Sequence, residues 1–312
     1  MRGNVLLTNE NFRMATNGIR EIARDSDEYP AQLAPAPWAP EILYAVGRIA
    51  PGDALAVAIV GSRRATPYGL DVAERLGAEL AVRGITVVSG LARGIDSAAH
   101  RGALEAGGRT IAVLGSGVDT IYPPENRALA DRISRSGAVL SQFAPGTRPL
   151  RHHFPERNRV IAGLSLGVVV VEATERSGSL ITAGFAADLG REVMAVPGRV
   201  TSPESDGTHR LIQDGAALVR GADDVIALLP ERWQACVRTA ATSVVPGRAP
   251  ARMSGDAGAV FGALGAEPAT IDDVIEQSGI PSGRVAALLL ELELAGRIRQ
   301  LEGKCFVRVG RG

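Results

Sequence analysis

A glycine–serine–arginine loop follows one predicted strand and could bind phosphate. Gly61, Ser62 and Arg63 come directly after the apolar run Ala56–Val60. Glycine lets backbone N–H groups approach an anion, and a helix beginning near Pro67 would add its N-terminal dipole. The Arg63 guanidinium would supply a forked donor for phosphate oxygens. On these residues alone, a tight turn with a solvated arginine is an equally good interpretation.

A second loop of this kind follows the run Thr86–Ser89 and carries Arg93 between two glycines. Because the carboxyl ends of parallel strands meet at one edge of a sheet, Arg93 is expected to form a second wall of the same pocket. We expect Asp96 to cap the following helix. His100, one turn later, is more typical of a packing or hydrogen-bonding residue than of a catalytic base.

The most basic short segment of the chain starts at Arg148 and leads into an aromatic residue at a predicted helix entrance. Phe154 is followed by Arg157, Asn158 and Arg159. Stacking on an aromatic ring tolerates any base, and arginines follow the backbone, so this combination is typical of sites for single-stranded nucleic acid. In the alternative interpretation, Phe154 belongs to the core and one arginine pairs with a glutamate.

A third feature follows the run Val168–Glu172, where Ser177, Gly178 and Ser179 precede another predicted helix. Their hydroxyl and N–H groups could hold a further phosphate, although serine and glycine are also ordinary helix starts. A further glycine-bearing loop, Leu114–Asp119, follows the run that starts at Thr110, so that five glycine- or serine-bearing loops lie at strand ends on one edge of the predicted sheet. This convergence predicts an anion-binding groove.

The elements that must position these residues are short apolar runs alternating with amphipathic helices. Runs rich in Val and Ile without polar alternation are typical of strands covered on both faces, and this order predicts βαβ units. We therefore expect an α/β fold with an extended, Rossmann-like, doubly wound and mostly parallel sheet. Its strands are predicted at Ala56–Val60, Thr86–Ser89, Thr110–Leu114, Ala138–Ser141, Val168–Glu172 and Glu192–Val196.

The chain divides by composition into four parts. Residues 1–40 form a polar and proline-rich lead-in, and 41–235 the Rossmann-like domain. Residues 236–257, rich in Ala, Thr, Ser, Pro and Gly, predict a linker. Residues 258–312 predict three helices and a hairpin, which indicates a small winged-helix domain. Its last helix carries acidic residues, so we expect this domain to bind protein or pack on the sheet rather than bind DNA.

Composition limits the class of protein. The 312 residues carry 34 basic and 34 acidic side chains, so any attraction for nucleic acid must be local. No run of about 18 apolar residues that could span a membrane is present, and no secretion signal is recognisable, which predicts a cytoplasmic protein. Cys236 and Cys305 stand far apart without nearby ligands, so neither a disulfide framework nor a metal site is expected.

Taken in order, these motifs resemble the DprA (Smf) family of DNA-processing proteins. The resemblance extends from about Tyr29 to Val225 and adds the Tyr122–Pro123 and Val196–Gly198 motifs to the loops above. It implies a homodimer that binds single-stranded DNA, protects incoming strands and helps load the RecA recombinase in natural transformation and recombination. It implies no cofactor and no catalytic residue. Many members carry a small helical module before the Tyr-Pro motif, which is expected to be absent or truncated here.

The implied DNA-binding residues come from all of the loops described above. They are Gly61, Ser62, Arg63, Arg93, Phe154, Arg157, Asn158, Arg159, Ser177, Gly178 and Ser179.

The main alternative is a nucleotide-binding enzyme of the phosphoribohydrolase, lysine-decarboxylase-like type. Such enzymes carry a Pro-Gly-Gly-X-Gly-Thr loop followed by a glutamate, whereas this chain has Ser177–Ser179 and no glutamate in the helix that follows. The Gly-X-Gly-X-X-Gly and Gly-Lys-Ser/Thr loops of NAD- and ATP-binding enzymes are also missing after the first strand. The sequence therefore favours a binding protein over an enzyme.

Overall fold

The computed structural model describes residues 18–237, 255–264, 269–294, 298–301 and 305–308. The chain forms two compact units, divided between Ala241 and Thr242. The predicted linker, apart from its first two and last three residues, lies outside the described residues. Each unit has its own hydrophobic core.

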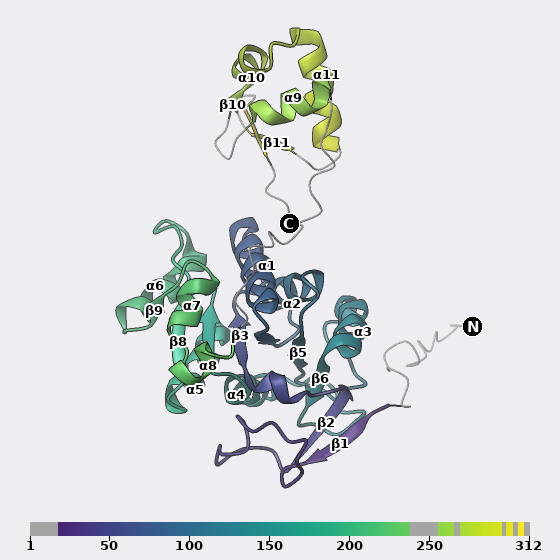
Figure 1. Cartoon of the computed structure of the whole chain (residues 1–312), viewed down its shortest axis with the longest axis vertical. Coiled ribbons are helices and arrows are strands. Elements are labelled where there is room, and N and C mark those ends of the chain that lie inside the picture. Colours follow the sequence, from purple (N-terminus) through teal and green to yellow (C-terminus); the bar gives the residue numbers. More distant parts are fainter. Residues whose placement is uncertain (1–17, 238–254, 265–268, 295–297, 302–304, 309–312) are drawn as a thin grey trace, which may run out of the picture. The chain divides into compact units, whose positions relative to one another are not determined.

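The first unit is built on a nine-stranded sheet with the order β1-β2-β6-β5-β4-β3-β7-β8-β9 (Figure 1). The seven strands that follow one another in the sheet as β6-β5-β4-β3-β7-β8-β9 are parallel. At one side of the sheet, β2 pairs antiparallel with β6, and β1 pairs antiparallel with β2. The strands are β1 (Arg20–Ala23), β2 (Ile42–Gly47), β3 (Ala56–Val60), β4 (Thr86–Ser89), β5 (Thr110–Val113), β6 (Ala138–Ser141), β7 (Gly167–Val170), β8 (Glu192–Ala195) and β9 (Ala217–Leu218). The expected doubly wound, mostly parallel sheet is confirmed.

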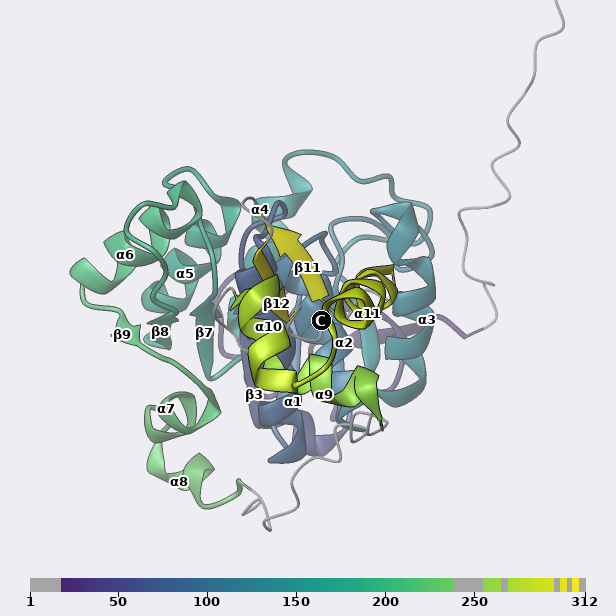
Figure 2. The same ribbon diagram turned by 90° about the horizontal axis from the view of Figure 1, so that it is seen from above.

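Helices cover both faces of this sheet, and α3 and α6 lie toward its opposite ends (Figure 2). They are α1 (Pro67–Val82), α2 (Ile95–Glu105), α3 (Arg127–Ser136), α4 (His153–Leu164), α5 (Gly178–Asp188), α6 (Asp206–Gln213), α7 (Ala222–Ala227) and α8 (Glu231–Gln234). Among the described residues, short 3-10 helices occur at η2 (Pro51–Ala54), η3 (Pro124–Asn126) and η4 (Pro203–Ser205).

The strand β3 shows why the buried runs lack polar alternation. Its Ala56, Ala58 and Val60 side chains join the core under α4 and α5. Val57 and Ile59 point to the other face and join the core under α1 and α2. Since successive side chains of a strand point to opposite faces, a strand between two helical layers must be apolar at every position.

The helices α1 and α2 approach each other very closely. A Cβ atom at Gly102 of α2 would lie 1.9 Å from the Glu74 carbonyl oxygen of α1, and one at Gly77 of α1 would lie 2.4 Å from the Ala99 carbonyl oxygen. Glycines at these crossing points therefore set the spacing of the two helices. This spacing also fixes the loops that lead into them.

The segment expected to be an extended lead-in belongs in part to the sheet. Residues from Arg20 form β1, which pairs with β2, and Leu33 and Ala36 are buried in the core under α4. The Tyr29 hydroxyl donates a hydrogen bond to the Pro40 carbonyl, and burial raises the pKa of this tyrosine to about 12. The proline-rich stretch is thus a packed part of the first unit.

The second unit is a winged helix, as expected. It contains α9 (Asp256–Ala263), α10 (Ile271–Ser278) and α11 (Ser282–Leu294), and a sheet of β10 (Ala269–Thr270), β12 (Cys305–Arg308) and β11 (Ile298–Leu301) in that order. Thr270 caps α10 by accepting a hydrogen bond from the Asp273 backbone N–H group. The hairpin expected in this unit is predicted to turn near Glu302, which lies outside the described residues. On α11, Arg284 forms an ion pair with Asp256 at 3.5 Å.

In the described part of the chain, every helix is too short or too polar to span a membrane.

Candidate nucleic-acid interface

The parallel sheet has a switch point between β3 and β7. The helix that follows β3 lies on one face of the sheet, and the helix that follows β7 lies on the other. In open α/β sheets, ligands bind in the crevice that such a reversal leaves at the carboxyl ends of the strands. The structure has a cleft of about 800 Å³ at this point, lined by residues after β3 and β7 and by the start of α4.

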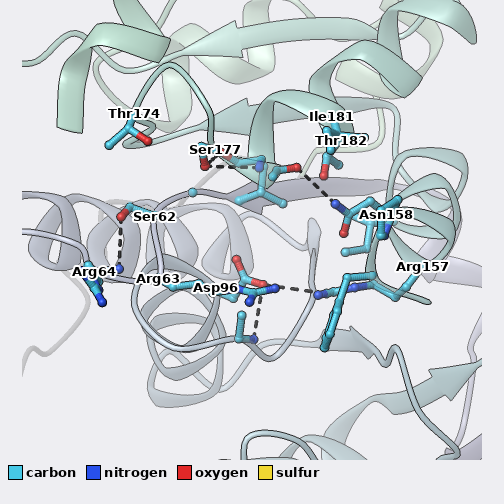
Figure 3. A pocket seen from close by; sticks show the side chains of 18 of the residues that line it. Ser62, Arg63, Arg64, Asp96, Arg157, Asn158, Thr174, Ser177, Ile181 and Thr182 are labelled. Atoms are coloured by element: carbon cyan, nitrogen blue, oxygen red, sulfur yellow. Dashed lines mark hydrogen bonds and ion pairs between the residues drawn. The ribbon is translucent and has the colours of Figure 1, made fainter. Parts of the chain in front are cut away.

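The wall of the cleft after β7 carries hydroxyl groups and the N-terminus of α5, opposite Ser62 and Arg63 (Figure 3). Ser177 caps α5 by accepting a hydrogen bond from the Ser179 N–H group, and the two hydroxyl oxygens lie 2.7 Å apart. Thr182 lines the cleft, is only 1% exposed, and its hydroxyl makes no hydrogen bond to a described residue. This wall can therefore donate hydrogen bonds to an anion.

The N-terminus of α1, on the opposite side of the switch point, is already occupied by a side chain. Glu172 accepts hydrogen bonds from the Thr66 N–H group at 2.9 Å and from the Thr66 hydroxyl at 2.5 Å. Its carboxyl group lies where a Cβ atom of Gly69 would be, at 2.3 Å. The sequence pattern predicts an anion-binding role for this helix start, but the chain's own Glu172 occupies it.

An arginine and two aromatic rings gather on the wall formed by α4 and the loops after β3 and β5. The Arg63 guanidinium lies over the Phe154 ring, 5.0 Å from its centroid. The Tyr122 ring lies 6.0 Å from that of Phe154, tilted by 49°. All three residues line the cleft. Phe154 is thus at the site and not in the core, as the preferred interpretation of the sequence required.

Arg157 forms the floor of the cleft and is only 4% exposed. Its guanidinium donates a hydrogen bond to the Val113 carbonyl at 3.3 Å and lies 3.9 Å from the Asp96 carboxyl group. Burial lowers the pKa of Arg157 to about 10 and raises that of Asp96. The guanidinium also lies where a side chain of Gly90 would be, 1.2 Å from its Cβ position. Position 90 must therefore be glycine, because any side chain there would overlap the Arg157 guanidinium.

Asp96 does not cap α2, contrary to our expectation. The N-cap residue is Gly94, with a positive φ of 74° that favours glycine. Asp96 instead accepts hydrogen bonds from the Gly90 and Ala92 N–H groups, on either side of Leu91, which has a φ of 56°. The Asp96 carboxyl group therefore holds the loop after β4 in its left-handed turn.

His100 is a packing residue, as expected. It is fully buried, its Nδ1 atom lies 2.7 Å from the Thr110 hydroxyl oxygen, and burial lowers its pKa to about 3. It does not line the cleft.

The structure brings most of the remaining predicted residues together, with two exceptions. Gly61, Asn158 and Gly178 line the cleft, and the Asn158 amide donates a hydrogen bond to the Gly178 carbonyl. Arg93 lines a smaller neighbouring cavity and forms an ion pair with Glu125. Arg159 does not line the cleft, because its guanidinium lies over the Phe185 ring at 4.9 Å.

Two arginines and a tyrosine are among the cleft residues that were not predicted as site residues. Arg64 follows Arg63, Arg151 precedes Phe154 by three positions, and Tyr122 belongs to the Tyr-Pro motif after β5. Arg64 and Arg151 are exposed and form no ion pair with a described residue. The signal for Arg151 was available, since it belongs to the most basic segment of the sequence.

The fold and the site together define a Rossmann-like protein with an arginine- and hydroxyl-lined cleft at the switch point of its sheet and with a winged-helix unit. Residues 20–230 match the model of the DNA recombination-mediator protein A family, and residues 245–304 match that of the DprA winged helix domain. The chain therefore belongs to the DprA/Smf family of DNA-processing proteins.

Relatives and solved structures agree with this assignment. The chain is 41% identical over 310 residues to a putative DNA processing protein DprA of Mycobacterium tuberculosis, covering 95% of this chain and 79% of the relative. It is 39% identical over 298 residues to the protein Smf of Escherichia coli, covering 93% and 77%. The DprA structure from Streptococcus pneumoniae superposes with a TM-score of 0.65 at 45% identity, covering 69% of this chain and 75% of that one.

A further match is DNA processing protein A from Helicobacter pylori, in a structure that describes its single-stranded DNA binding mode. Its TM-score is 0.60 at 31% identity, covering 67% of this chain and 94% of that one.

Proposed function

We propose that this protein binds single-stranded DNA in the switch-point cleft. Arg63, Arg64 and Arg151 neutralise backbone phosphates, and a base stacks on the Phe154 and Tyr122 rings. The observation that carries this proposal is the Arg63 guanidinium 5.0 Å from the Phe154 centroid within a cleft of about 800 Å³. Cationic groups beside exposed aromatic faces suit single strands, whose bases are free to stack. The single-stranded DNA binding described for the Helicobacter pylori relative supports it.

The balance of paired and unpaired charges supports the same residues. Arg63, Arg64 and Arg151 line the cleft and form no ion pair with a described residue. Of the two acidic residues in its lining, Asp96 is buried beside Arg157 and Glu204 accepts a hydrogen bond from the Ser202 hydroxyl. Local positive charge is therefore available although the whole chain is neutral. The serine and threonine hydroxyls on the α5 wall would bind a phosphate or sugar oxygen opposite these arginines.

The test is fluorescence-anisotropy titration of a labelled poly-dT strand across a salt series, with duplex DNA as competitor. We expect single-strand-selective binding that weakens steeply with salt. Arg63→Ala and Arg151→Ala should each weaken binding and lower the slope of log affinity against log salt by about 0.7, the value for one phosphate on a single strand.

The matched control is Arg159→Ala, an exposed arginine of α4 whose guanidinium lies over the Phe185 ring and which does not line the cleft. It changes the net charge equally, and we expect it to leave the salt slope unchanged. Equal effects of all three substitutions would contradict a localised site. Failure of the wild type to bind poly-dT would refute the proposal and favour a small-nucleotide site of the phosphoribohydrolase type.

We further propose that the protein acts as a non-enzymatic homodimer that protects incoming strands and helps load RecA in transformation and recombination. Family membership supports this role. Nuclease protection of bound poly-dT and the rate of RecA assembly on that strand measure the two activities. Light scattering measures the dimer, and a monomer at micromolar concentration would contradict it.

A further inference from the structure

Tyr68 exposes an aromatic ring beyond the cleft. It is 49% exposed, and with Tyr122, at 42%, it is one of two Phe, Tyr or Trp side chains in the described residues with such exposure. The Tyr68 hydroxyl donates a hydrogen bond of 2.9 Å to the Pro197 carbonyl, which fixes the ring. A ring that is held in place and exposed loses little conformational entropy when a base stacks on it.

An exposed arginine follows β8 in the same stretch of chain as the Pro197 carbonyl that holds the Tyr68 hydroxyl. Arg199, two residues after Pro197, is exposed and forms no ion pair with a described residue. Its neighbour Val200 is 86% exposed. The end of β8 thus repeats the chemistry of the cleft, where Arg63 accompanies Phe154: an accessible aromatic face and a free guanidinium.

The order of the strands places this feature in line with the cleft. Tyr122 follows β5, Arg63 and Arg64 follow β3, and Pro197 follows β8. All of them lie at the carboxyl edge of parallel strands. Neighbouring strands lie about 4.8 Å apart, so the four steps from β5 to β8 cover about 19 Å. At a rise of about 3.4 Å per stacked nucleotide, this distance corresponds to about six nucleotides.

We propose that Tyr68 and Arg199 form a second subsite for single-stranded DNA, where a base stacks on Tyr68 and Arg199 binds an adjacent phosphate. This inference rests on the proposed function of the cleft and extends it. The strand runs along the carboxyl edge of the sheet, from the Tyr122–Phe154 rings past the arginines to the end of β8.

The experiment compares a dT3 trinucleotide, which fills only the cleft, with a dT12 oligonucleotide, which reaches both subsites. For dT12, Tyr68→Leu should weaken binding about 5- to 100-fold, the range for one lost stacking contact. Tyr68→Phe, which keeps the ring, should retain most of the affinity. Neither change should alter the affinity for dT3.

Arg199→Gln should lower the salt slope for dT12 by about 0.7 and leave that for dT3 unchanged. Arg132→Gln, an exposed arginine of α3, is the control for net charge and should leave both unchanged. In a Tyr68→Trp variant, addition of dT12 should quench the fluorescence of the new indole, and dT3 should not.

The outcomes separate this inference from the proposed function. If the wild type binds neither oligonucleotide, the proposed function fails and the second subsite fails with it. If the wild type binds both and Tyr68→Leu leaves dT12 affinity intact, the second subsite is refuted and the cleft stands. If Tyr68→Leu weakens dT3 and dT12 equally and lowers the melting temperature, Tyr68 is a structural tether and the inference is wrong.

Discussion

Replacing Arg157 by methionine tests whether this buried arginine binds DNA or positions the groups that do. The sequence pattern predicts that Arg157 binds a phosphate, but its guanidinium lies on the cleft floor beside Asp96 and contacts the Val113 carbonyl. We expect Arg157→Met to weaken single-stranded DNA binding without lowering its salt slope. The reason is that Asp96, once unpaired, holds the loop after β4 less firmly.

The size of the effect follows from the geometry of the pair. Two unit charges 3.9 Å apart attract by about 4 kcal/mol at an effective dielectric constant of about 20. Removing one partner of a buried pair costs about 3–5 kcal/mol, because the other group stays buried without compensation. We therefore expect the free energy of unfolding to fall by about this amount. Arg157→Met combined with Asp96→Asn should recover part of it, since asparagine still accepts a hydrogen bond from Gly90.

Urea unfolding measures the stability, and anisotropy titration of poly-dT on the folded variant measures binding. Arg63→Ala serves as the reference for loss of a phosphate contact. A fall in salt slope as large as that of Arg63→Ala would show that Arg157 reaches a phosphate, and the positioning role would be wrong. Unchanged affinity together with lower stability would leave Arg157 a purely structural residue.

Two further predictions concern stability. Burial lowers the pKa of His100 from 6.5 to about 3, so the unfolded chain binds a proton more readily than the folded chain. The free energy of unfolding should therefore fall as the pH drops below about 6.5, by up to about 1.4 kcal/mol per pH unit. Urea unfolding at several pH values measures this dependence, and His100→Gln should remove the contribution. Gly102→Ala should destabilise the protein by about 1–3 kcal/mol, because its Cβ atom would lie 1.9 Å from the Glu74 carbonyl oxygen. Gly184→Ala, on the open surface of α5, should instead stabilise the protein by about 0.5–1 kcal/mol. Equal shifts in the melting temperatures of the two variants would contradict this account of the α1–α2 crossing.

The central strands could be predicted from sequence because their physical requirement is local. The runs Ala56–Val60 and Thr86–Ser89 were predicted with the bounds that the structure has. Both are covered on two faces and therefore apolar throughout. The strands β1, β2 and β9 were missed, and β1, for example, is only partly buried and reads Arg-Glu-Ile-Ala. Their place in the sheet depends on pairing with distant residues, which a local pattern does not contain.

The location of the site could also be predicted, but not the state of each side chain. Strand order brings the loops of Arg63 and Ser177 to one cleft, and the sequence indicated both. Tertiary contacts decide the state of the other arginines. Arg157 is buried, Arg93 pairs with Glu125, and Arg159 lies over the Phe185 ring. Such contacts decide which of several neighbouring arginines stays free for a ligand.

The glutamate that fills the start of α1 bears on what kind of phosphate the switch point accepts. A pyrophosphate carries at least two charges within a few ångströms, and Rossmann-type sites meet them with a glycine-rich loop and the helix start behind the first strand. Here Glu172 takes up the Thr66 donors at that position. What remains open is the start of α5 and separate arginines, spread along the edge of the sheet. This spacing of charge suits a polynucleotide, in which each phosphodiester carries a single charge and the next lies one nucleotide further on.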